Sequence, residues 1–322
     1  MVTAGFVDSH THPVFYNKRD EEYRMRLSGA TYEEIAENGG GIISSVEGVR
    51  NASKEALVEK VMKRMDRFIK VGTTTIEAKS GYGLNTDSEL KSLSVIDEVN
   101  QNHAIDMVPT FMGAHAFPKE FSNDHDAYID LICNEMIPAV TDQGVAIFND
   151  VFCEDKYFTV DQSRRILEAG REHGLKPRLH ADEFVDSGAA ELAGEINAFS
   201  ADHLMAVSEL GMRSIADNDV VATLLPGTTF FLGKSTYAPA RKLIDNNVTV
   251  ALATDFNPGS SHIQSMPFIM TLACMHMEMT VEEAFQSVTY NGAKALGMEL
   301  SLIHISEPTR RTPISYAVFC LK

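Results

Sequence analysis

The chain has 322 residues, of which 44% are hydrophobic and 23% are charged, a balance typical of globular proteins with a large core. This composition excludes disordered, collagen-like and coiled-coil chains. Asp and Glu number 45 against 28 Lys and Arg, and the resulting net charge of −17 disfavours nucleic acid or an anionic membrane as partner. We therefore expect a small-molecule ligand, and neither nucleic acid nor a membrane.

No apolar run approaches the ~20 residues that cross a bilayer, and the N-terminal sequence lacks the basic-then-apolar pattern of a signal peptide. These features predict a cytoplasmic protein. The four cysteines are far apart in the sequence, so we interpret them as small buried side chains and not as a zinc or disulfide framework.

Apolar β-branched runs alternate with longer amphipathic runs, which is the pattern of parallel strands joined by crossover helices. Strands are predicted over residues 5–10, 73–78, 104–112, 145–153, 177–180, 198–204, 220–225 and 248–255. Helices are predicted over residues 54–71, 87–99, 160–173, 189–193, 208–216, 238–245, 266–277 and 281–296. Eight strand-helix units in series favour a closed (β/α)8 TIM barrel over an open doubly wound sheet. The long first connection, 13–52, is predicted to form a loop or lid over the site.

Both ends of the chain are unusual. A strand runs directly into the sequence DSHTH at residues 8–12, and we expect that something upstream is missing. Residues 300–322 resemble a translated sequencing adapter, and we predict a non-native tail without ordered structure there. His304 and Cys320 are therefore excluded from the functional argument, and the barrel is predicted over residues 1–299.

Histidines and carboxylates fall at the C-terminal ends of the predicted strands, where barrel enzymes build their active sites. His10 and His12 form an H-x-H pair whose side chains point to the same side, because strand side chains alternate. Two imidazoles so placed can bind one metal ion. The ends of strands five, six and eight supply the other members of the set: His180, Glu183, His203 and Asp255.

This arrangement resembles the amidohydrolase superfamily. Within it, the segments that are similar to the imidazolonepropionase family are SHTHPVF, GTTTIEAKSGYGL, PTFMGAHAFP, LHADE, SADHL, LLPGTTFFLGKSTYAPAR and LATDFNPGSS. The resemblance covers nearly all of residues 5–297. It implies hydrolysis of the cyclic amide C–N bond of 4-imidazolone-5-propanoate to N-formimidoyl-L-glutamate in histidine degradation. It also implies a homodimer and a small companion β-sandwich domain, and we expect this domain to be missing here.

The resemblance implies that one Zn(II) or Fe ion is bound by four residues: His10, His12, His180 and Asp255. Three imidazoles and one carboxylate suit a borderline ion of this kind. Superfamily members with two metals bridge them with a lysine on strand four. The predicted strand four, VAIFNDVFC, contains no lysine, which favours a single metal ion.

Hydrolysis of the imidazolone carbonyl requires an activated water molecule and a proton for the departing ring nitrogen. A metal lowers the pKa of bound water from ~15.7 towards ~7 and so supplies hydroxide at neutral pH. Glu183, His203 and Asp255 are placed to orient that water and to move its proton. The sequence leaves open which of these three is the principal base.

The substrate carries a propanoate, so a cationic partner is expected. Arg19 matches the family's position for this partner, and a guanidinium can bind a carboxylate bidentately. The resemblance implies further substrate contacts from Tyr82, His115, Glu183, Asn257, Gly259 and Ser260. Lys79 and Arg241 are additional candidates for binding an anion.

Two alternative functions remain open. The first is another mononuclear amidohydrolase, such as a cyclic amidine deaminase, which would keep the metal ligands and change the pocket. The second is a catalytically inactive barrel that only binds a ligand or a metal. Glu183 and His203 argue against an inactive barrel, because a binding protein has no need of them beside four metal ligands.

Overall fold

The computed structural model describes residues 3–29 and 40–298, so the predicted tail at 300–322, with His304 and Cys320, lies outside the described residues. Within the described part, eight parallel strands form one sheet in sequence order. They are β1 (Phe6–Asp8), β2 (Thr73–Lys79), β3 (Asp106–Ala114), β4 (Phe148–Cys153), β5 (Lys176–Ala181), β6 (Ser200–His203), β7 (Val221–Leu224) and β8 (Val250–Leu252).

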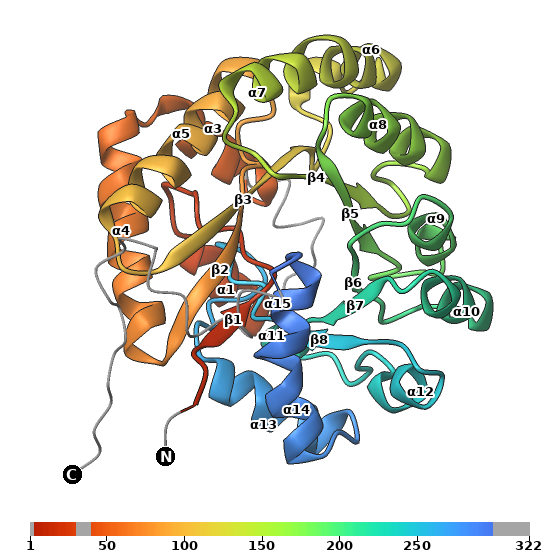
Figure 1. Cartoon of the computed structure of the whole chain (residues 1–322). Helices are drawn as coiled ribbons and strands as arrows, with labels where there is room; N and C mark the ends of the chain where they lie inside the picture. The colour runs from red at the N-terminus through yellow and green to blue at the C-terminus, as the bar shows by residue number, and fades with distance from the viewer. Residues whose placement is uncertain (1–2, 30–39, 299–322) are drawn as a thin grey trace, which may run out of the picture.

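The first and last strands are joined beyond their C-terminal ends. The Asp255 amide donates to the carbonyl of His10 at 3.1 Å, and the His12 amide donates to the carbonyl of Phe256 at 2.8 Å. These bonds connect the two edges of the sheet, and the strands form the ring seen in Figure 1. The predicted (β/α)8 barrel is confirmed.

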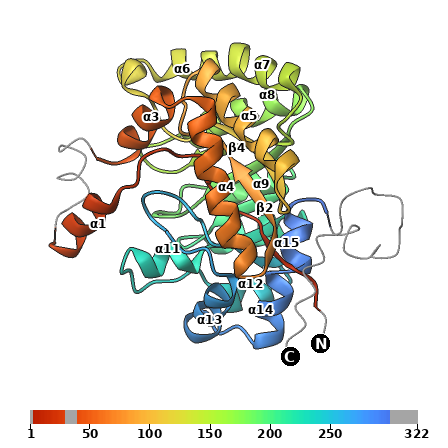
Figure 2. The ribbon, with the colours of Figure 1, turned by 90° about the vertical axis from the view of Figure 1, so that its left-hand side faces the viewer.

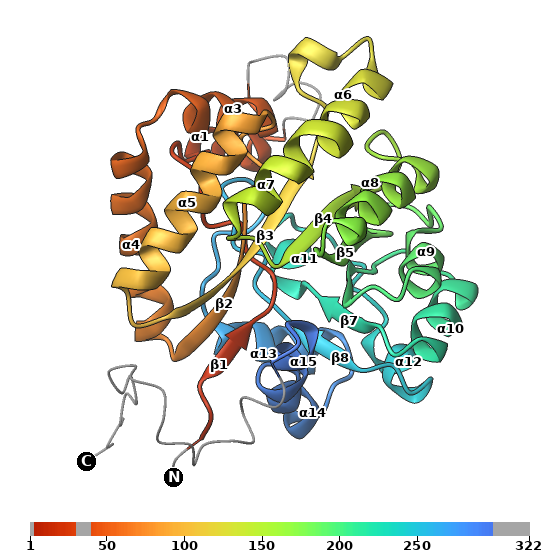
Figure 3. The same ribbon diagram turned by 45° about the horizontal axis from the view of Figure 1, so that its top comes forward.

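Helices surround the ring of strands (Figures 1 and 3). The α-helices are α1 (Asp20–Leu27), α3 (Ile42–Asn51), α4 (Lys54–Lys70), α5 (Thr86–Asn102), α6 (His125–Leu131), α7 (Ile137–Gln143), α8 (Val160–Glu172), α9 (Ala189–Glu195), α10 (Glu209–Asp217), α11 (Pro226–Phe231), α12 (Ala240–Asp245), α13 (Met266–His276), α14 (Val281–Ser287) and α15 (Tyr290–Ala295). A 3-10 turn, η1 (Lys119–Phe121), and a π-helical segment, η2 (Ile132–Met136), flank α6.

Side-chain caps explain where several of these helices begin. The side chains of Ser53, Asn85 and Thr159 accept backbone N–H groups from the first turns of α4, α5 and α8. Such caps satisfy donors that have no partner inside the helix. None of the helices in residues 3–29 and 40–298 combines the length and the apolar character needed to cross a membrane.

The structure corrects three predicted boundaries. The helix predicted over 281–296 is two helices, α14 and α15, separated by a turn at Thr289. The first connection, predicted as a loop or lid, contains α1 and α3. Strands β1 and β8 end at Asp8 and Leu252, so His10 and Asp255 lie on the segments that follow the strands.

The N-terminal end of the barrel is covered by α15. Its Ala293 and the following Leu296 pack against Val7, Val108 and Phe148 at the starts of the strands. Figure 2 shows α1 and α3 at the opposite end of the molecule from α15. The predicted site residues lie at that opposite end, where the strands terminate.

Candidate active site

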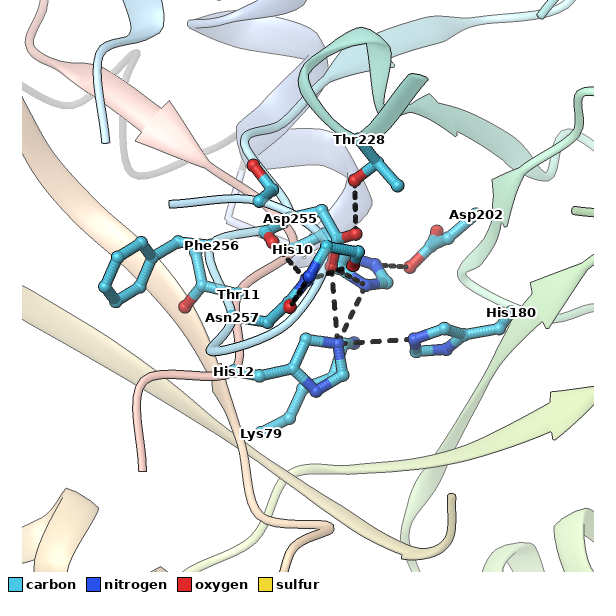
Figure 4. A network of polar contacts seen from close by, with 12 residues as sticks. His10, Thr11, His12, Lys79, His180, Asp202, Thr228, Asp255, Phe256 and Asn257 are labelled. Carbon is cyan, nitrogen blue, oxygen red and sulfur yellow. Dashed lines mark hydrogen bonds and ion pairs between the residues drawn. The ribbon is translucent and has the colours of Figure 1, made fainter. Parts of the chain in front are cut away.

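Four side chains that were predicted as metal ligands converge at the C-terminal end of the barrel (Figure 4). His12 Nε2 lies 3.3 Å from His10 Nε2 and 3.4 Å from His180 Nε2. One oxygen of Asp255, Oδ1, lies 3.6 Å from Nε2 of both His10 and His12. All four residues are buried. We refer to these four atoms as the donor cluster.

The outer nitrogens of two of these histidines face carboxylates. His10 Nδ1 lies 2.6 Å from Asp202, and His180 Nδ1 lies 3.0 Å from Asp150. Because an ionised carboxylate only accepts hydrogen bonds, we assign the proton of each ring to Nδ1. The Nε2 lone pairs of His10 and His180 then point toward His12. Burial holds the pKa values of His10 and His12 well below their usual range, so both rings are neutral.

This arrangement fits a divalent cation. His12 carries at most one proton on Nε2, which cannot satisfy the lone pairs of both His10 and His180. The N···N distances of 3.3 and 3.4 Å are also informative. They match the edge of a tetrahedron whose corners lie about 2.0–2.1 Å from its centre, as nitrogen ligands of Zn²⁺ do.

Glu183 and His203 lie beside the donor cluster and, with Asp255 of the cluster itself, are the candidate proton carriers of the site. Glu183 Oε2 lies 3.7 Å from His203 Nε2, and the His203 ring centroid lies 5.2 Å from that of His180. Burial, together with the nearby Asp255 charge, raises the pKa of Glu183 to about 8. Burial raises the pKa of Asp255 to about 6. Carboxyl groups tuned in this direction can exchange protons near neutral pH.

His203 and Asp255 share an unusual backbone conformation. Their φ angles are +80° and +51°, in the left-handed region that residues other than glycine adopt infrequently. Such conformations gather at functional sites, where surrounding structure maintains them. Here Asp255 is held on one side by the Thr228 hydroxyl, which donates to Oδ2 at 2.5 Å and leaves Oδ1 facing the histidines.

Tyr82 and His115 form one wall of the site. The His115 ring stacks on His12 with centroids 5.0 Å apart, and the Tyr82 ring lies 5.1 Å from His115. His115 Nδ1 faces the Gly81 carbonyl oxygen at 2.9 Å. The structure thus brings both residues predicted from strands two and three next to the donor cluster.

Arg19 reaches the loop that follows β8. A Cβ atom on Gly259 would lie only 2.2 Å from Arg19 Nη1, and the guanidinium is paired with Glu22 at 2.6 Å. In the same loop, Asn257 Oδ1 accepts from the backbone N–H groups of Gly259 and Ser260. The Asn257 amide group is therefore engaged in shaping this loop.

Sequence reasoning missed the charged residues behind the histidines. These are Glu77, Lys79, Asp150, Arg178 and Asp202, all fully buried. Charged residues are rarely buried unless they are paired, so charges within apolar strands were the available signal. Lys79, considered above as an anion-binding candidate, is instead paired with Glu77 and Asp150, and Arg241 is paired with Glu283.

The amidohydrolase family model matches residues 1–305, and the chain belongs to this family. Its fold agrees with that of a 5-methylcytosine deaminase from Klebsiella pneumoniae liganded with 5-fluorocytosine. The TM-score is 0.70 at 15% identity, and the match covers 91% of this chain and 75% of the deaminase. At this identity, the likeness concerns the fold alone.

Within the family, the chain is similar to curated imidazolonepropionases. It is 51% identical over 314 residues to the imidazolonepropionase of Geobacillus thermodenitrificans. The aligned region covers 98% of this chain and 74% of the relative. The chain is also 51% identical over 295 residues to that of Alkaliphilus metalliredigens, which covers 92% of this chain and 70% of the relative. The resemblance to imidazolonepropionases and the hydrolase class predicted from the sequence are confirmed.

Proposed function

We propose that the chain hydrolyses the cyclic amide C–N bond of 4-imidazolone-5-propanoate and gives N-formimidoyl-L-glutamate in histidine degradation. The observation that carries this proposal is a pair of buried clusters that share His10: one contains His12 and Asp255, and the other contains His180 and His203. Glu183 lies 3.7 Å from His203 beside them. The similarity to imidazolonepropionases over most of the chain supports the choice of substrate.

The proposed cofactor is one Zn(II) or Fe ion, held by His10, His12, His180 and Asp255. When bound, such an ion would acidify a water molecule and polarise the carbonyl group whose carbon is attacked. The absence of lysine from β4, with the sequence FNDVFC, supports one ion, because a bridging lysine on this strand is the mark of two-metal relatives.

Glu183 is the proposed proton shuttle. Among the described residues it makes no hydrogen bond, whereas Asp255 Oδ2 accepts one from Thr228. Its carboxylate is therefore able to take the proton of the attacking water and to deliver it to the ring nitrogen as the C–N bond opens. His203, 3.7 Å from Glu183, orients the water in this scheme, and Asp255 shares proton transfer as well as binding the ion.

The substrate propanoate pairs with Arg19 in this proposal, and the imidazolone ring lies along Tyr82 and His115. Asn257, Gly259 and Ser260 form the adjoining loop wall. Arg19 has a second role in the structure, since its contact with Gly259 joins the first connection to this loop. The homodimer, the cytoplasmic location and the assignment of residues 1–299 to one barrel remain predictions from the sequence.

The proposal is tested by loading the full chain with Zn²⁺ or Fe²⁺ and following N-formimidoyl-L-glutamate by mass spectrometry. His180→Ala is expected to lose bound metal and nearly all turnover. The matched control is His173→Ala, because His173 is an exposed histidine at the end of α8.

Full activity in His180→Ala would overturn the metal assignment. Release of ammonia from a purine or pyrimidine, with no turnover of imidazolonepropanoate, would identify a deaminase instead. Binding of the substrate without any turnover would identify an inactive barrel.

A further inference from the structure

Behind the donor cluster, two buried cations are each linked to a histidine through an aspartate. Lys79 Nζ donates to Asp150 Oδ2 at 2.6 Å, and Asp150 Oδ1 accepts from His180 Nδ1 at 3.0 Å. We call these three residues the Lys79 triad. The Arg178 triad consists of Arg178, Asp202 and His10: Asp202 Oδ2 accepts from Arg178 Nη2 at 3.1 Å and from His10 Nδ1 at 2.6 Å.

Both cations, Lys79 and Arg178, are completely buried. A buried charge is costly unless it is paired and hydrogen-bonded. Burial by itself lowers the pKa of Lys79, but the charges of Asp150 and Glu77 outweigh this effect and raise the pKa. The cation is therefore matched to the two carboxylates that surround it.

The same groups also hold the backbone on both sides of His10. Arg178 Nη2 donates to the carbonyl of Ser9 at 2.8 Å. On the other side, Glu77 Oε1 accepts from Lys79 at 2.8 Å, and Glu77 Oε2 accepts from the Thr11 amide at 3.1 Å. The two triads and Glu77 thus connect strands β2, β4, β5 and β6 to the segment that carries the H-x-H pair.

We propose that Lys79 and Arg178 are positioning residues for metal binding. Each fixes the aspartate that orients one imidazole, so that Nε2 of His180 or His10 faces the donor cluster. Outer partners of metal-binding histidines generally fix the tautomer and the orientation of the ring. The third histidine provides a contrast: His12 Nδ1 has no hydrogen-bond partner among the described residues, and its ring is stacked on His115.

This inference rests on the proposed metal site, and its first test is a double-mutant cycle read out as Zn²⁺ affinity in the full chain. Lys79→Gln is expected to weaken Zn²⁺ binding about 10- to 100-fold in chelator competition, the usual loss for such outer partners. If Lys79 acts through Asp150, adding Lys79→Gln to the Asp150→Asn variant should change the Zn²⁺ affinity less than about threefold. Lys79→Arg, which keeps the charge, should retain more affinity than Lys79→Gln.

Tyr128→Phe is the control for a general loss of stability. Tyr128 is fully buried, and its hydroxyl donates to the Gly113 carbonyl at 2.8 Å, away from both triads. It should keep the wild-type Zn²⁺ affinity. Independent, additive effects of Lys79→Gln and Asp150→Asn on affinity would overturn the proposal.

The second test needs no metal and no variant at the outset. In the metal-free full chain, proton NMR should show slowly exchanging Nδ1–H signals from His10 and His180. Lys79→Gln should move or broaden the His180 signal and leave that of His10 in place, and Arg178→Gln should do the reverse. If the wild-type chain shows these signals but does not bind Zn²⁺, the proposed function is contradicted, while the hydrogen bonding within the triads is supported. If the wild-type chain lacks these signals, the proposed triads are overturned.

Discussion

At the residue scale, Glu183 differs from the other carboxylates of the site because it is buried without a hydrogen bond to the described residues. We predict that Glu183→Gln lowers kcat about 10²- to 10⁴-fold, the usual contribution of a positioned acid or base. The metal content should stay unchanged, because Glu183 is outside the donor cluster. Steady-state kinetics and elemental analysis check this, with Glu172→Gln on the exposed face of α8 as control. An effect confined to KM would show that Glu183 only binds the substrate.

A second residue-scale prediction concerns Gly259, where the absence of a side chain makes room for Arg19. A methyl group would lie 2.2 Å from Arg19 Nη1, so Gly259→Ala must displace the guanidinium. We expect KM for imidazolonepropanoate to rise about tenfold with little change in kcat, because a binding contact made equally in ground and transition states is lost. In an Arg19→Met background, Gly259→Ala should have no further effect on KM. An equal further increase there would show that the loop itself, and not Arg19, responds to the methyl group.

At the scale of the element, α8 supports two strands that carry site residues, β4 with Asp150 and β5 with His180. Thr159 and Gln162 form a reciprocal capping box at its start. We predict that Thr159→Ala lowers the free energy of unfolding by about 1 kcal/mol, while Thr159→Ser retains most of the stability. Urea denaturation of the three proteins measures this. Equal loss in the Ser and Ala variants would mean that packing of the methyl group, and not the cap, stabilises α8.

The bounds of helices and strands were predictable from the sequence where the local residue pattern sets them. They were not predictable where contacts with a distant segment set them. The strands and α4, α5 and α8 follow from apolar runs and capping residues. The break between α14 and α15 does not, because the Val288 carbonyl accepts from the Val7 amide at 2.8 Å, a bond to the other end of the described chain. The backbone hydrogen bonds that hold the segments of His10 and Asp255 together beyond β1 and β8 also join parts of the chain that are distant in sequence.

For the molecule as a whole, the alternation of strands and helices predicted both the barrel and the end at which polar residues would gather. The four residues of the donor cluster were expected as metal ligands through the family resemblance, and the alternation predicted only that they lie at one end of the barrel. The two triads were not expected, because nothing along the chain indicates that Lys79 lies beside Asp150, or Arg178 beside Asp202. Those pairings depend on which side chains the closed barrel directs inward from neighbouring strands.

The donor cluster has a consequence for the stability of the whole barrel. Its residues lie after β1, within β5 and after β8, so an ion bound there would link the two edges of the sheet through His10, His12 and Asp255. A ligand that binds only the native state adds about 2.7 kcal/mol at a concentration 100 times its Kd. In a chain of this size that free energy corresponds to a rise in Tm of roughly 4 °C.

We therefore predict that treatment with a chelator lowers Tm by about this amount, and that Zn²⁺ restores it. Mg²⁺ should not restore it, because it prefers oxygen ligands and the cluster offers mainly imidazole nitrogen. Differential scanning calorimetry on the full chain measures the shift, with His180→Ala as the reference that should no longer respond to chelation. A wild-type Tm that stays the same with and without chelator would show that no native-state cation links β1 to β8. In that case, closure of the barrel would depend on the backbone bonds between His10 and Asp255 and between His12 and Phe256.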